Sequence, residues 1–238
     1  MKTLVVFDFD HTLVDGNSDT WVIKCAPDQC IPDWLKNSYQ KGRWTEYMGR
    51  VLTYLGDNAV SRDTVRSVME TLPFTDGMID LLKFIASNKN CIDCIIISDS
   101  NTLFIDWILQ AAGVQAAVDR VFTNPARFDE RGYMIVECYH SHECRQCPVN
   151  LCKNEVLDEF LKSQSQHGVE YHLICYIGDG GNDLCPVKSL KPSDLVLPRK
   201  GYALERLLTK SESELLKPRI VVWSDGFEIM NEITALIE

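Results

Sequence analysis

The chain has 238 residues, of which 45% are hydrophobic, so it can bury the core of one large α/β domain or a core with an insertion. Its formal net charge of −10 argues against non-specific nucleic-acid binding, and no long basic segment opposes that conclusion. We expect no transmembrane helix and no membrane partner, because no run of about 18 apolar residues occurs.

The N-terminal segment and the cysteines bear on the cellular compartment. Residues 1–7 begin like a signal peptide, but Asp8 and Asp10 interrupt the apolar run and no small-residue cleavage site follows. Several of the ten cysteines, such as Cys94 and Cys175, lie inside apolar strand-like runs, where buried thiols are common. We therefore expect a reduced, cytoplasmic protein rather than a disulfide-bonded scaffold.

The first predicted elements are a buried strand at about 3–8 and a helical unit at 18–72. Ser61 is expected to cap one of its helices, and Pro73 ends the unit. We predict that 18–72 form a small helical cap over the end of the first strand. The alternative is that these helices belong to the core. One helical stripe supports the helical assignment: Trp44, Tyr47, Met48, Val51, Leu52 and Leu55.

From residue 73 onward, helical and strand-like segments alternate, which predicts βαβ units around a parallel sheet. We therefore predict an α/β fold, a Rossmann-like parallel sheet flanked by helices, with the core formed by 1–17 and 73–238. The segment 126–152 is predicted to be irregular. Strands are expected at about 92–97, 117–123, 172–177, 194–198 and 219–223, and helices at about 76–89, 102–112, 153–166, 202–216 and 226–237.

Polar side chains follow several predicted strands, which is where parallel sheets bind ligands. Asp8 and Asp10 end the first strand, and two carboxylates this close repel each other unless a cation lies between them. Oxygen ligands favour a hard cation such as Mg²⁺, which in turn favours an anionic substrate. The alternative for this pair is an acidic turn. The same predicted site includes Ser98, Lys153, Asp179 and Asp183.

Four motifs, in this order, resemble those of the haloacid dehalogenase superfamily, in its branch of phosphatases with an aspartate nucleophile. They are DFDHT at 8–12, IIISDS at 95–100, Lys153 and GDGGND at 178–183. The resemblance covers essentially the whole chain, and the insertion after the first motif is similar to the small helical caps of that superfamily. It implies a Mg²⁺-dependent phosphomonoesterase with a small phosphorylated metabolite as its partner.

The resemblance also implies a role for each motif residue. Asp8 would be the nucleophile that forms an aspartyl-phosphate, and Asp10 would act as general acid and then as general base. Mg²⁺ would be held by Asp8, the backbone carbonyl of Asp10 and Asp179, with Asp183 as a further ligand or as the partner of metal-bound water. The phosphate group would be bound by Ser98 and Lys153.

Longer segments resemble the vertebrate phosphoethanolamine/phosphocholine phosphatase family, which includes a paralogue described as a pyridoxal phosphate phosphatase. They are DFDHTLVDGNSD at 8–19, EYMGRVLTYLG at 46–56, ISDSNT at 97–102, HSHECRQCPVNLCK at 140–153 and YIGDGGNDLCP at 176–186.

One position departs from the phosphoethanolamine/phosphocholine enzyme. The phosphoethanolamine/phosphocholine enzyme has Glu where this chain has His11, which favours the pyridoxal phosphate paralogue. The resemblance further implies that Asp19 and Asp99 contact the substrate. The alternative for both residues is helix capping, with Asp19 at the first cap helix and Asp99 at the helix after the second strand.

The segment before Lys153 carries a second candidate site, for structural zinc. An HxH pair followed by CxxC and a further cysteine has the spacing of zinc ligands. The alternatives are a reduced cysteine-rich loop and a redox-sensitive thiol pair. The candidate ligands are His140, His142, Cys144, Cys147 and Cys152.

Three other functions remain as alternatives. A phospho-receiver-like signalling domain also combines a phosphorylated Asp, a Ser or Thr and a Lys on an α/β fold, but it is much shorter and lacks a counterpart of Asp10. A metal-binding interaction protein built on the Cys/His segment would leave the catalytic set unexplained. A dehalogenase shares the fold but has no use for a Mg²⁺ site with Asp10 and Asp179.

Overall fold

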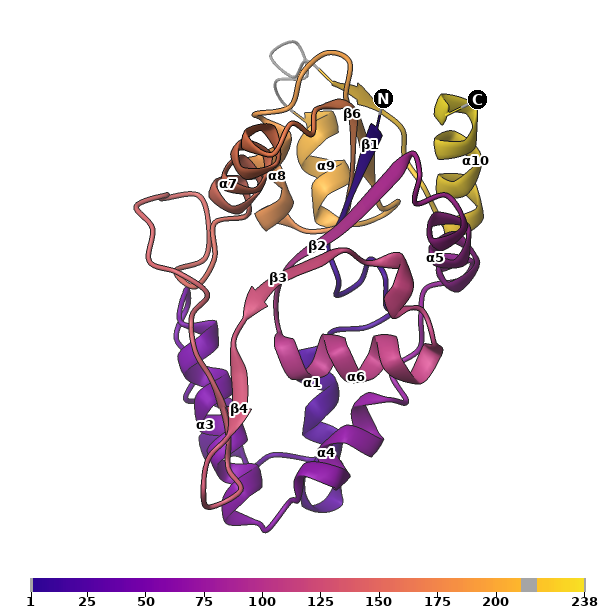
Figure 1. Cartoon of the computed structure of the whole chain (residues 1–238). Coiled ribbons are helices and arrows are strands. Elements are labelled where there is room, and N and C mark those ends of the chain that lie inside the picture. Colours follow the sequence, from indigo (N-terminus) through magenta and orange to yellow (C-terminus); the bar gives the residue numbers. More distant parts are fainter. Residues whose placement is uncertain (1, 211–217, 238) are drawn as a thin grey trace.

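The structure is a computed structural model that describes residues 2–210 and 218–237. Its centre is a sheet of six parallel strands in the order β3-β2-β1-β6-β7-β8 (Figure 1). The predicted parallel α/β sheet is therefore confirmed. The strands are β1 (Lys2–Phe7), β2 (Ile92–Asn101), β3 (Arg120–Asn124), β6 (Tyr171–Gly178), β7 (Leu195–Pro198) and β8 (Arg219–Ile220).

Helices cover both faces of this sheet (Figure 1). The side chains of β1 alternate between two apolar clusters, with Val5 and Phe7 in one and Leu4 and Val6 in the other. Because successive side chains of a strand point to opposite faces, a strand covered on both sides needs an unbroken apolar run. One face is covered by α5 (Met78–Ser87) and α10 (Gly226–Ile237), the other by α7 (Lys153–Gln166), α8 (Leu184–Val187) and α9 (Ala203–Lys210).

The strand order reverses beside β1. The chain passes from β1 through β2 to β3 on one side, and then through β6, β7 and β8 on the other. The carboxyl ends of β1 and β6 therefore border the switch point where ligands bind in such sheets. Asp8 directly follows β1 and Asp179 directly follows β6, so the topology brings these two carboxylates together.

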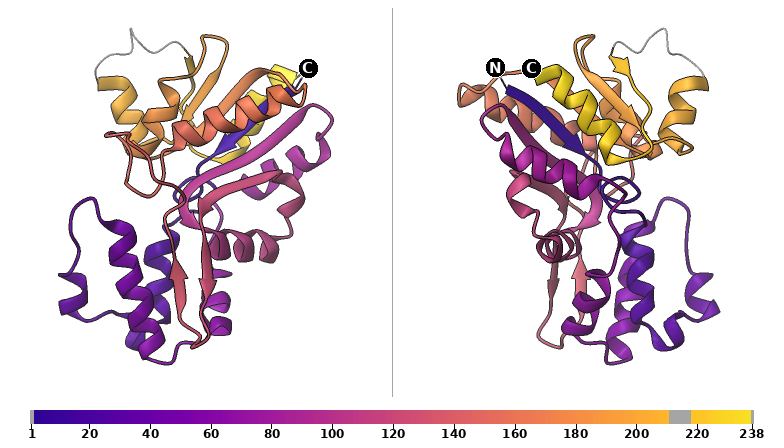
Figure 2. Two further views of the ribbon diagram at one scale, coloured as in Figure 1. Left: turned by 60° about the vertical axis from the view of Figure 1, so that its left-hand side comes forward. Right: turned by 90° about the vertical axis from the view of Figure 1, so that its right-hand side faces the viewer.

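The segment after β1 is helical, as predicted, and lies beyond the carboxyl ends of the strands (Figures 1 and 2). The predicted stripe of α3 is buried except for Trp44, which is half-buried. Ser61 caps the next helix, because its hydroxyl accepts a hydrogen bond from the Thr64 N–H at 3.1 Å. We retain 18–72 as a proposed cap. Its helices are α1 (Ser18–Trp21), α2 (Asp33–Lys36), α3 (Trp44–Asp57) and α4 (Arg62–Met69), with 3₁₀ turns at Val22–Cys25 and Pro27–Gln29.

The prediction of an irregular segment over 126–152 is wrong for its first part. Here β4 (Ala126–Phe128) and β5 (Met134–Val136) form an antiparallel hairpin that extends along α3 (Figure 2). The Tyr133 hydroxyl donates to Asp57 Oδ1 at 2.9 Å, and a Cβ on Gly56 would overlap the Tyr133 ring. Strands of three residues are too short to give a recognisable alternation, so the sequence carried little signal for this hairpin.

Several predicted boundaries also shift. Strand β2 continues to Asn101, so the polar residues from Ser98 onward belong to the strand itself. Helix α5 begins at Met78 with Gly77 at its N-cap, whereas α6 (Thr102–Ala112) matches its prediction. Of the helix predicted at 202–216, α9 covers 203–210, Tyr202 precedes this helix, and 211–216 lie outside the described residues. In the described part of the chain, no helix is long and apolar enough to cross a membrane.

Candidate active site

Asp8 lies at the carboxyl end of the central strand β1. Its backbone N–H donates to the Ile177 carbonyl oxygen at 2.9 Å, which ties it to β6. The Oδ1 atom accepts a hydrogen bond from the Phe9 N–H at 2.7 Å and forms an ion pair with Lys153 Nζ at 2.8 Å. Both contacts end on Oδ1, so they orient the carboxylate without using Oδ2.

Lys153 begins α7 and is 1% exposed. Its Nζ atom lies 2.7 Å from Asp183 Oδ1 and 2.8 Å from Asp8 Oδ1. Burial alone would lower the pKa of Lys153, but the carboxylates of Asp183 and Asp8 outweigh burial and raise this pKa above its usual value. The lysine is therefore a permanently charged link between the loops after β1 and β6.

Asp183 is held by four protein groups. Besides Lys153, its Oδ1 atom accepts a hydrogen bond from the Tyr176 hydroxyl at 2.8 Å. Its Oδ2 atom accepts from the backbone N–H groups of Asp179 at 3.1 Å and Gly180 at 2.9 Å. A Cβ on Gly178 would lie 2.5 Å from Oδ2, so a glycine is needed there. These contacts fix the glycine-rich turn after β6 around the Asp183 side chain.

The carboxylates of Asp8, Asp179 and Asp183 form a compact acidic group, with one oxygen of each within 4.8 Å of the others. Burial, followed by repulsion from Asp183, raises the pKa of Asp179 to about 6. Burial also raises the pKa of Asp8, although Lys153 opposes the shift. One lysine cannot balance three buried carboxylates, and hard oxygen donors suit a divalent cation such as Mg²⁺. The residues present therefore fit the expected metal ion.

Asp10 follows Asp8 by two residues and is anchored to the start of α1. Its Oδ1 atom accepts a hydrogen bond from the Ser18 N–H at 2.8 Å, and its Oδ2 atom accepts from the Ser18 hydroxyl at 3.0 Å. Ser18 in turn shares a hydrogen bond of 2.6 Å with the Ser100 hydroxyl of β2. Burial, and then the charge of Asp19, raises the pKa of Asp10 well above its usual value. This carboxyl group is therefore inclined to carry a proton.

The end of β2 brings Ser98 and Asp99 to the same edge of the sheet. Ser98 is buried, and its hydroxyl oxygen accepts the Ser100 N–H at 3.2 Å. Asp99 is half-buried, and its Oδ2 atom accepts from the Asn182 amide at 3.3 Å. The Asn124 amide of β3 donates to the carbonyl oxygens of Asp99 and Ser100 at 2.7 and 2.9 Å. These bonds hold the end of β2 against β3 and against the loop after β6.

Neither Asp19 nor Asp99 caps a helix, so the capping alternative is wrong for both. Asn17 caps α1 by accepting the Thr20 N–H, and Asn101 caps α6 by accepting the Phe104 N–H. Asp19 is half-buried and instead accepts the Trp44 indole N–H at 2.6 Å.

The environment of Asp19 also changes its ionisation. Burial raises the pKa of Asp19 to about 7, the Trp44 hydrogen bond opposes the shift, and the charge of Asp99 adds to it. Asp99 also raises the pKa of Asp10 and of Asp8, which places all four carboxylates within one electrostatic environment.

Sequence reasoning missed Arg199, which follows β7. Its guanidinium donates to the His11 carbonyl oxygen at 2.6 Å and to Asp15 Oδ1 at 2.7 Å. His11 has a left-handed backbone, with φ of 55°, and its ring lies 5.7 Å from that of Tyr202. The position of Arg199 at a strand end was an available signal, whereas Tyr176 and Ser18 gave none, because one lies in an apolar strand and the other resembles an ordinary capping serine.

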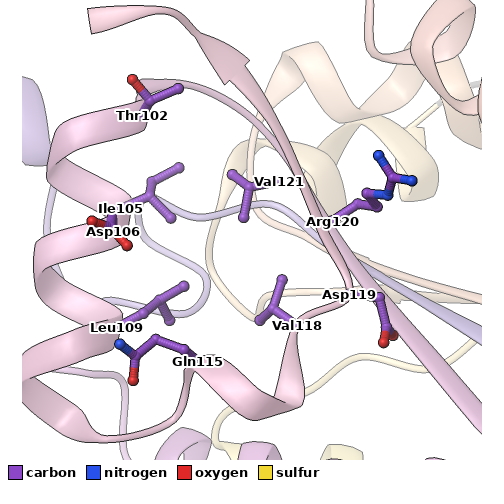
Figure 3. A pocket seen from close by; sticks show the side chains of 9 residues that line it. All are labelled: Thr102, Ile105, Asp106, Leu109, Gln115, Val118, Asp119, Arg120 and Val121. Atoms are coloured by element: carbon purple, nitrogen blue, oxygen red, sulfur yellow. The ribbon is translucent and has the colours of Figure 1, made fainter. Parts of the chain in front are cut away.

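A hollow of about 250 Å³ lies elsewhere, between α6 and the edge strand β3 (Figure 3). Its polar side chains, among them Asp106 and Arg120, do not converge on one point in Figure 3. It contains none of the predicted site residues. The hollow lies at the edge of the sheet, where, among the described residues, no further strand covers β3 and Val121 is partly exposed.

The family model described as "Putative Phosphatase" matches residues 3–237. The chain belongs to this phosphatase family. It is 55% identical over 240 residues to the Pyridoxal phosphate phosphatase PHOSPHO2 of Mus musculus, with 100% of both chains covered. It is 38% identical over 231 residues to the Phosphoethanolamine/phosphocholine phosphatase of Homo sapiens, which covers 96% of this chain and 86% of that protein. The phosphatase prediction is therefore confirmed.

A solved structure of phosphoserine phosphatase in its apo form has a similar fold. The TM-score is 0.63 at 17% identity, and the match covers 97% of this chain and 98% of that chain. At this identity the likeness concerns the fold alone, and it agrees with the expected α/β fold of a parallel sheet flanked by helices. Membership of a phosphatase family also favours the enzyme over the signalling and interaction alternatives.

Proposed function

We propose that this phosphatase hydrolyses pyridoxal 5′-phosphate in a Mg²⁺-dependent reaction that passes through a phosphorylated Asp8. The main support is the buried Asp8 carboxylate, whose Oδ1 is fixed by Lys153 and Phe9 while Oδ2 is used by neither contact. The choice of substrate is supported by the relative from Mus musculus that is 55% identical over its full length, which is named Pyridoxal phosphate phosphatase PHOSPHO2.

The metal ion would be held by oxygens of Asp8 and Asp179, with the backbone carbonyl of Asp10 as a third protein ligand. Asp183 already accepts four protein contacts, so we assign it the role of orienting Lys153 and the turn after β6. When bound, Mg²⁺ would neutralise phosphate charge and bring the dianionic substrate beside the acidic group.

The first chemical step would be attack by Asp8 Oδ2 on phosphorus. A bond forms between this oxygen and phosphorus, and the bond from phosphorus to the leaving alcohol oxygen breaks. Asp10 would supply the proton that the departing oxygen needs, because burial and the charge of Asp19 keep its pKa high. The products of this step are free pyridoxal and an aspartyl-phosphate.

The second step would hydrolyse the aspartyl-phosphate. Asp10, now ionised, would take a proton from a water molecule as that water attacks phosphorus, and the Asp8 carboxylate leaves. The two Ser18 hydrogen bonds stabilise the ionised form of Asp10 needed here. Asp10 therefore has partners suited to both of its charge states.

The phosphate oxygens would be bound by Ser98 and Lys153. The Lys153 ammonium is already fixed between two carboxylates, so it requires no rearrangement to donate to a phosphate oxygen. The Ser98 hydroxyl accepts a backbone N–H from Ser100, which leaves its proton free to donate to the substrate.

The ring of the substrate would lie between the end of β2 and the first cap helix. Asp19 and Asp99 border this region, and the Trp44 indole hydrogen-bonds to Asp19. A carboxylate there would pair with the pyridinium nitrogen or the ring hydroxyl of pyridoxal phosphate, and an aromatic side chain would stack on its flat ring. Trp44 reaches the border of this region through its hydrogen bond to Asp19.

The test is phosphate release by the purified protein with Mg²⁺, comparing pyridoxal 5′-phosphate, phosphoethanolamine, phosphocholine and p-nitrophenyl phosphate. We expect the highest kcat/KM for pyridoxal 5′-phosphate. Asp8→Asn should lower kcat by at least about 10³-fold for every substrate, because the nucleophile is lost. The matched control is Asp33→Asn, an exposed aspartate of α2.

Two outcomes would contradict the proposal in different ways. A higher kcat/KM for phosphoethanolamine or phosphocholine would assign the enzyme to the amine substrates while leaving the Asp8 chemistry intact. Turnover that survives Asp8→Asn would instead refute the proposed nucleophile, whichever substrate is preferred.

A further inference from the structure

Four cysteine side chains from two separate segments meet beside the start of α7. Three come from the loop before this helix and the fourth from α8, and their Sγ atoms all lie within 4.8 Å of one another. Cys144 and Cys185 are 3.8 Å apart at sulfur, and Cys147 and Cys152 are 3.6 Å apart. The thiol cluster consists of Cys144, Cys147, Cys152 and Cys185.

These spacings match a metal site better than a pair of disulfides. Sulfur atoms bonded in a disulfide are about 2.05 Å apart, and all four cysteines are free. Four thiolates arranged as a tetrahedron around zinc, with Zn–S distances of about 2.3 Å, have sulfurs about 3.8 Å apart. The two sulfur pairs of the thiol cluster are already at this separation.

The two histidines of the predicted zinc set do not join the cluster. His140 Nε2 accepts the Cys152 N–H at 2.9 Å. His142 Nδ1 accepts the Cys144 N–H at 3.2 Å, and its Nε2 lies 2.7 Å from the Pro148 carbonyl oxygen, to which it donates. This tautomer has no free lone pair for a metal. It also weakens a second possible ligand group, which combines His142 and Cys152 with the exposed Glu155.

Backbone N–H groups of the loop, those of Gln146 and Cys147, are directed at the Cys144 sulfur. Thiolates rather than thiols bind zinc, and backbone N–H groups directed at sulfur favour the thiolate. His140 and His142 support the loop through backbone hydrogen bonds, as outer partners of a metal site commonly do.

We propose that Cys144, Cys147, Cys152 and Cys185 bind one structural zinc ion. This set keeps three of the ligands expected from the sequence and replaces both histidines with Cys185, which is distant in the chain. All four positions are filled by protein, as in structural rather than catalytic zinc sites.

The position of the thiol cluster gives the zinc ion a role in the architecture of the active site. Cys152 immediately precedes Lys153, and Cys185 is two residues beyond Asp183. Lys153 and Asp183 form the buried ion pair of the active site, at 2.7 Å. Zinc would therefore fasten together the two backbone segments that carry this pair, next to the catalytic group but not within it.

The first test is metal analysis of the full chain, purified under reducing conditions without chelator. We expect about one zinc per chain, and a cobalt-substituted protein with the visible absorption typical of tetrahedral tetrathiolate cobalt. Absence of zinc would overturn the proposal, as would iron at the same stoichiometry. This readout requires no phosphatase activity, so it does not depend on the substrate proposal.

The second test uses matched cysteine variants. Cys185→Ser should lower zinc content at least about tenfold, because three thiolates hold zinc far less tightly than four. Cys138→Ser is the control, since Cys138 is exposed, lies in the same loop and stands outside the thiol cluster. Equal zinc content in both variants would contradict the proposal.

A third measurement distinguishes zinc from disulfides even if Cys185→Ser folds poorly. The wild-type protein, alkylated after unfolding without reductant but with chelator, should show all four cluster cysteines modified. A disulfide linking Cys144 to Cys185 or Cys147 to Cys152 would overturn the proposal in favour of a redox pair.

Discussion

The proposed phosphate side and the proposed leaving-group side of this site are built differently. On the phosphate side, Asp8, Lys153 and Asp183 are almost fully buried and joined by ion pairs and backbone hydrogen bonds. On the leaving-group side, Asp19 and Asp99 are half-buried, and each accepts one side-chain hydrogen bond. The ends of β1 and β6 and the start of α7 carry the first group, whereas α1 carries Asp19 and the end of β2 carries Asp99.

This difference indicates how one fold can keep its chemistry while changing its substrate. The phosphate-side residues are positioned by the sheet and by one another, so replacing one leaves others without partners. The leaving-group residues have fewer partners, so they can change at a smaller structural cost. Substitutions on the phosphate side should affect all substrates alike, and those on the leaving-group side should affect some substrates more than others.

Lys153→Met tests the phosphate side most severely. This substitution leaves Asp8 and Asp183 buried without their cation. We therefore expect the free energy of unfolding to fall by about 3–5 kcal/mol. The kcat should fall by about 10³-fold for every substrate, because the phosphate loses a fixed positive charge. Urea unfolding and steady-state assays measure both effects, with Lys162→Met as the control on an exposed position of the same helix. An unchanged free energy of unfolding would show that the buried ion pairs of Lys153 do not stabilise the fold.

Asp19→Asn tests the leaving-group side. Loss of a charged partner for the pyridine ring should lower kcat/KM for pyridoxal 5′-phosphate by about 10–100-fold. The value for p-nitrophenyl phosphate should change by less than about threefold, since that leaving group carries no matching cation. Equal losses for both substrates would place Asp19 in the common machinery and remove the proposed distinction.

The pH dependence of metal binding sharpens the comparison. The pKa of Asp179 is raised to about 6, mainly by burial, so this carboxylate takes up a proton as the pH falls through that value. A protonated carboxyl group is a poor ligand, so Mg²⁺ should bind about tenfold more weakly at pH 5 than at pH 7. Isothermal titration calorimetry on the substrate-free protein measures this change. Constant affinity over that range would argue against Asp179 as a ligand.

Ser18→Ala should give the smallest effect. Its hydroxyl stabilises the ionised Asp10 carboxylate, so its removal should raise the pKa of Asp10 further, by about one unit. In the proposed mechanism, hydrolysis of the aspartyl-phosphate needs ionised Asp10, so the acidic limb of its pH profile should move to higher pH. Single-turnover measurements follow this step, and Thr20→Ala is the control on the same helix. A downward shift would contradict the assigned role of Ser18.

Much of the fold could be predicted because its elements carry strong local signals. The apolar run of β1, the stripe on α3 and the helix beginning at Lys153 all agree with the structure. The hairpin of β4 and β5 could not be predicted, because its strands are short and depend on packing against α3. The local sequence pattern is sufficient to predict an element that has a regular apolar face. It is insufficient where contacts with a neighbouring element determine the conformation.

The same limit applies to the site. Residues directly after strands, such as Asp8 and Asp179, could be predicted because parallel strands end at a common edge. Tyr176 lies within an apolar strand, and its bond to Asp183 depends on which face it occupies. Cys185 joins the thiol cluster only through the packing of α8 beside α7, which no spacing in the sequence reveals.

The most direct test of the central claim is to identify the phosphorylated residue after rapid acid quenching. Protein mixed with pyridoxal 5′-phosphate labelled at phosphorus should carry label on the peptide that contains Asp8. Asp8→Asn should show no label, and Asp10→Asn should both form and lose the labelled species more slowly, because both steps use Asp10. Released phosphate without any labelled Asp8 peptide, or label on another residue, would contradict the account.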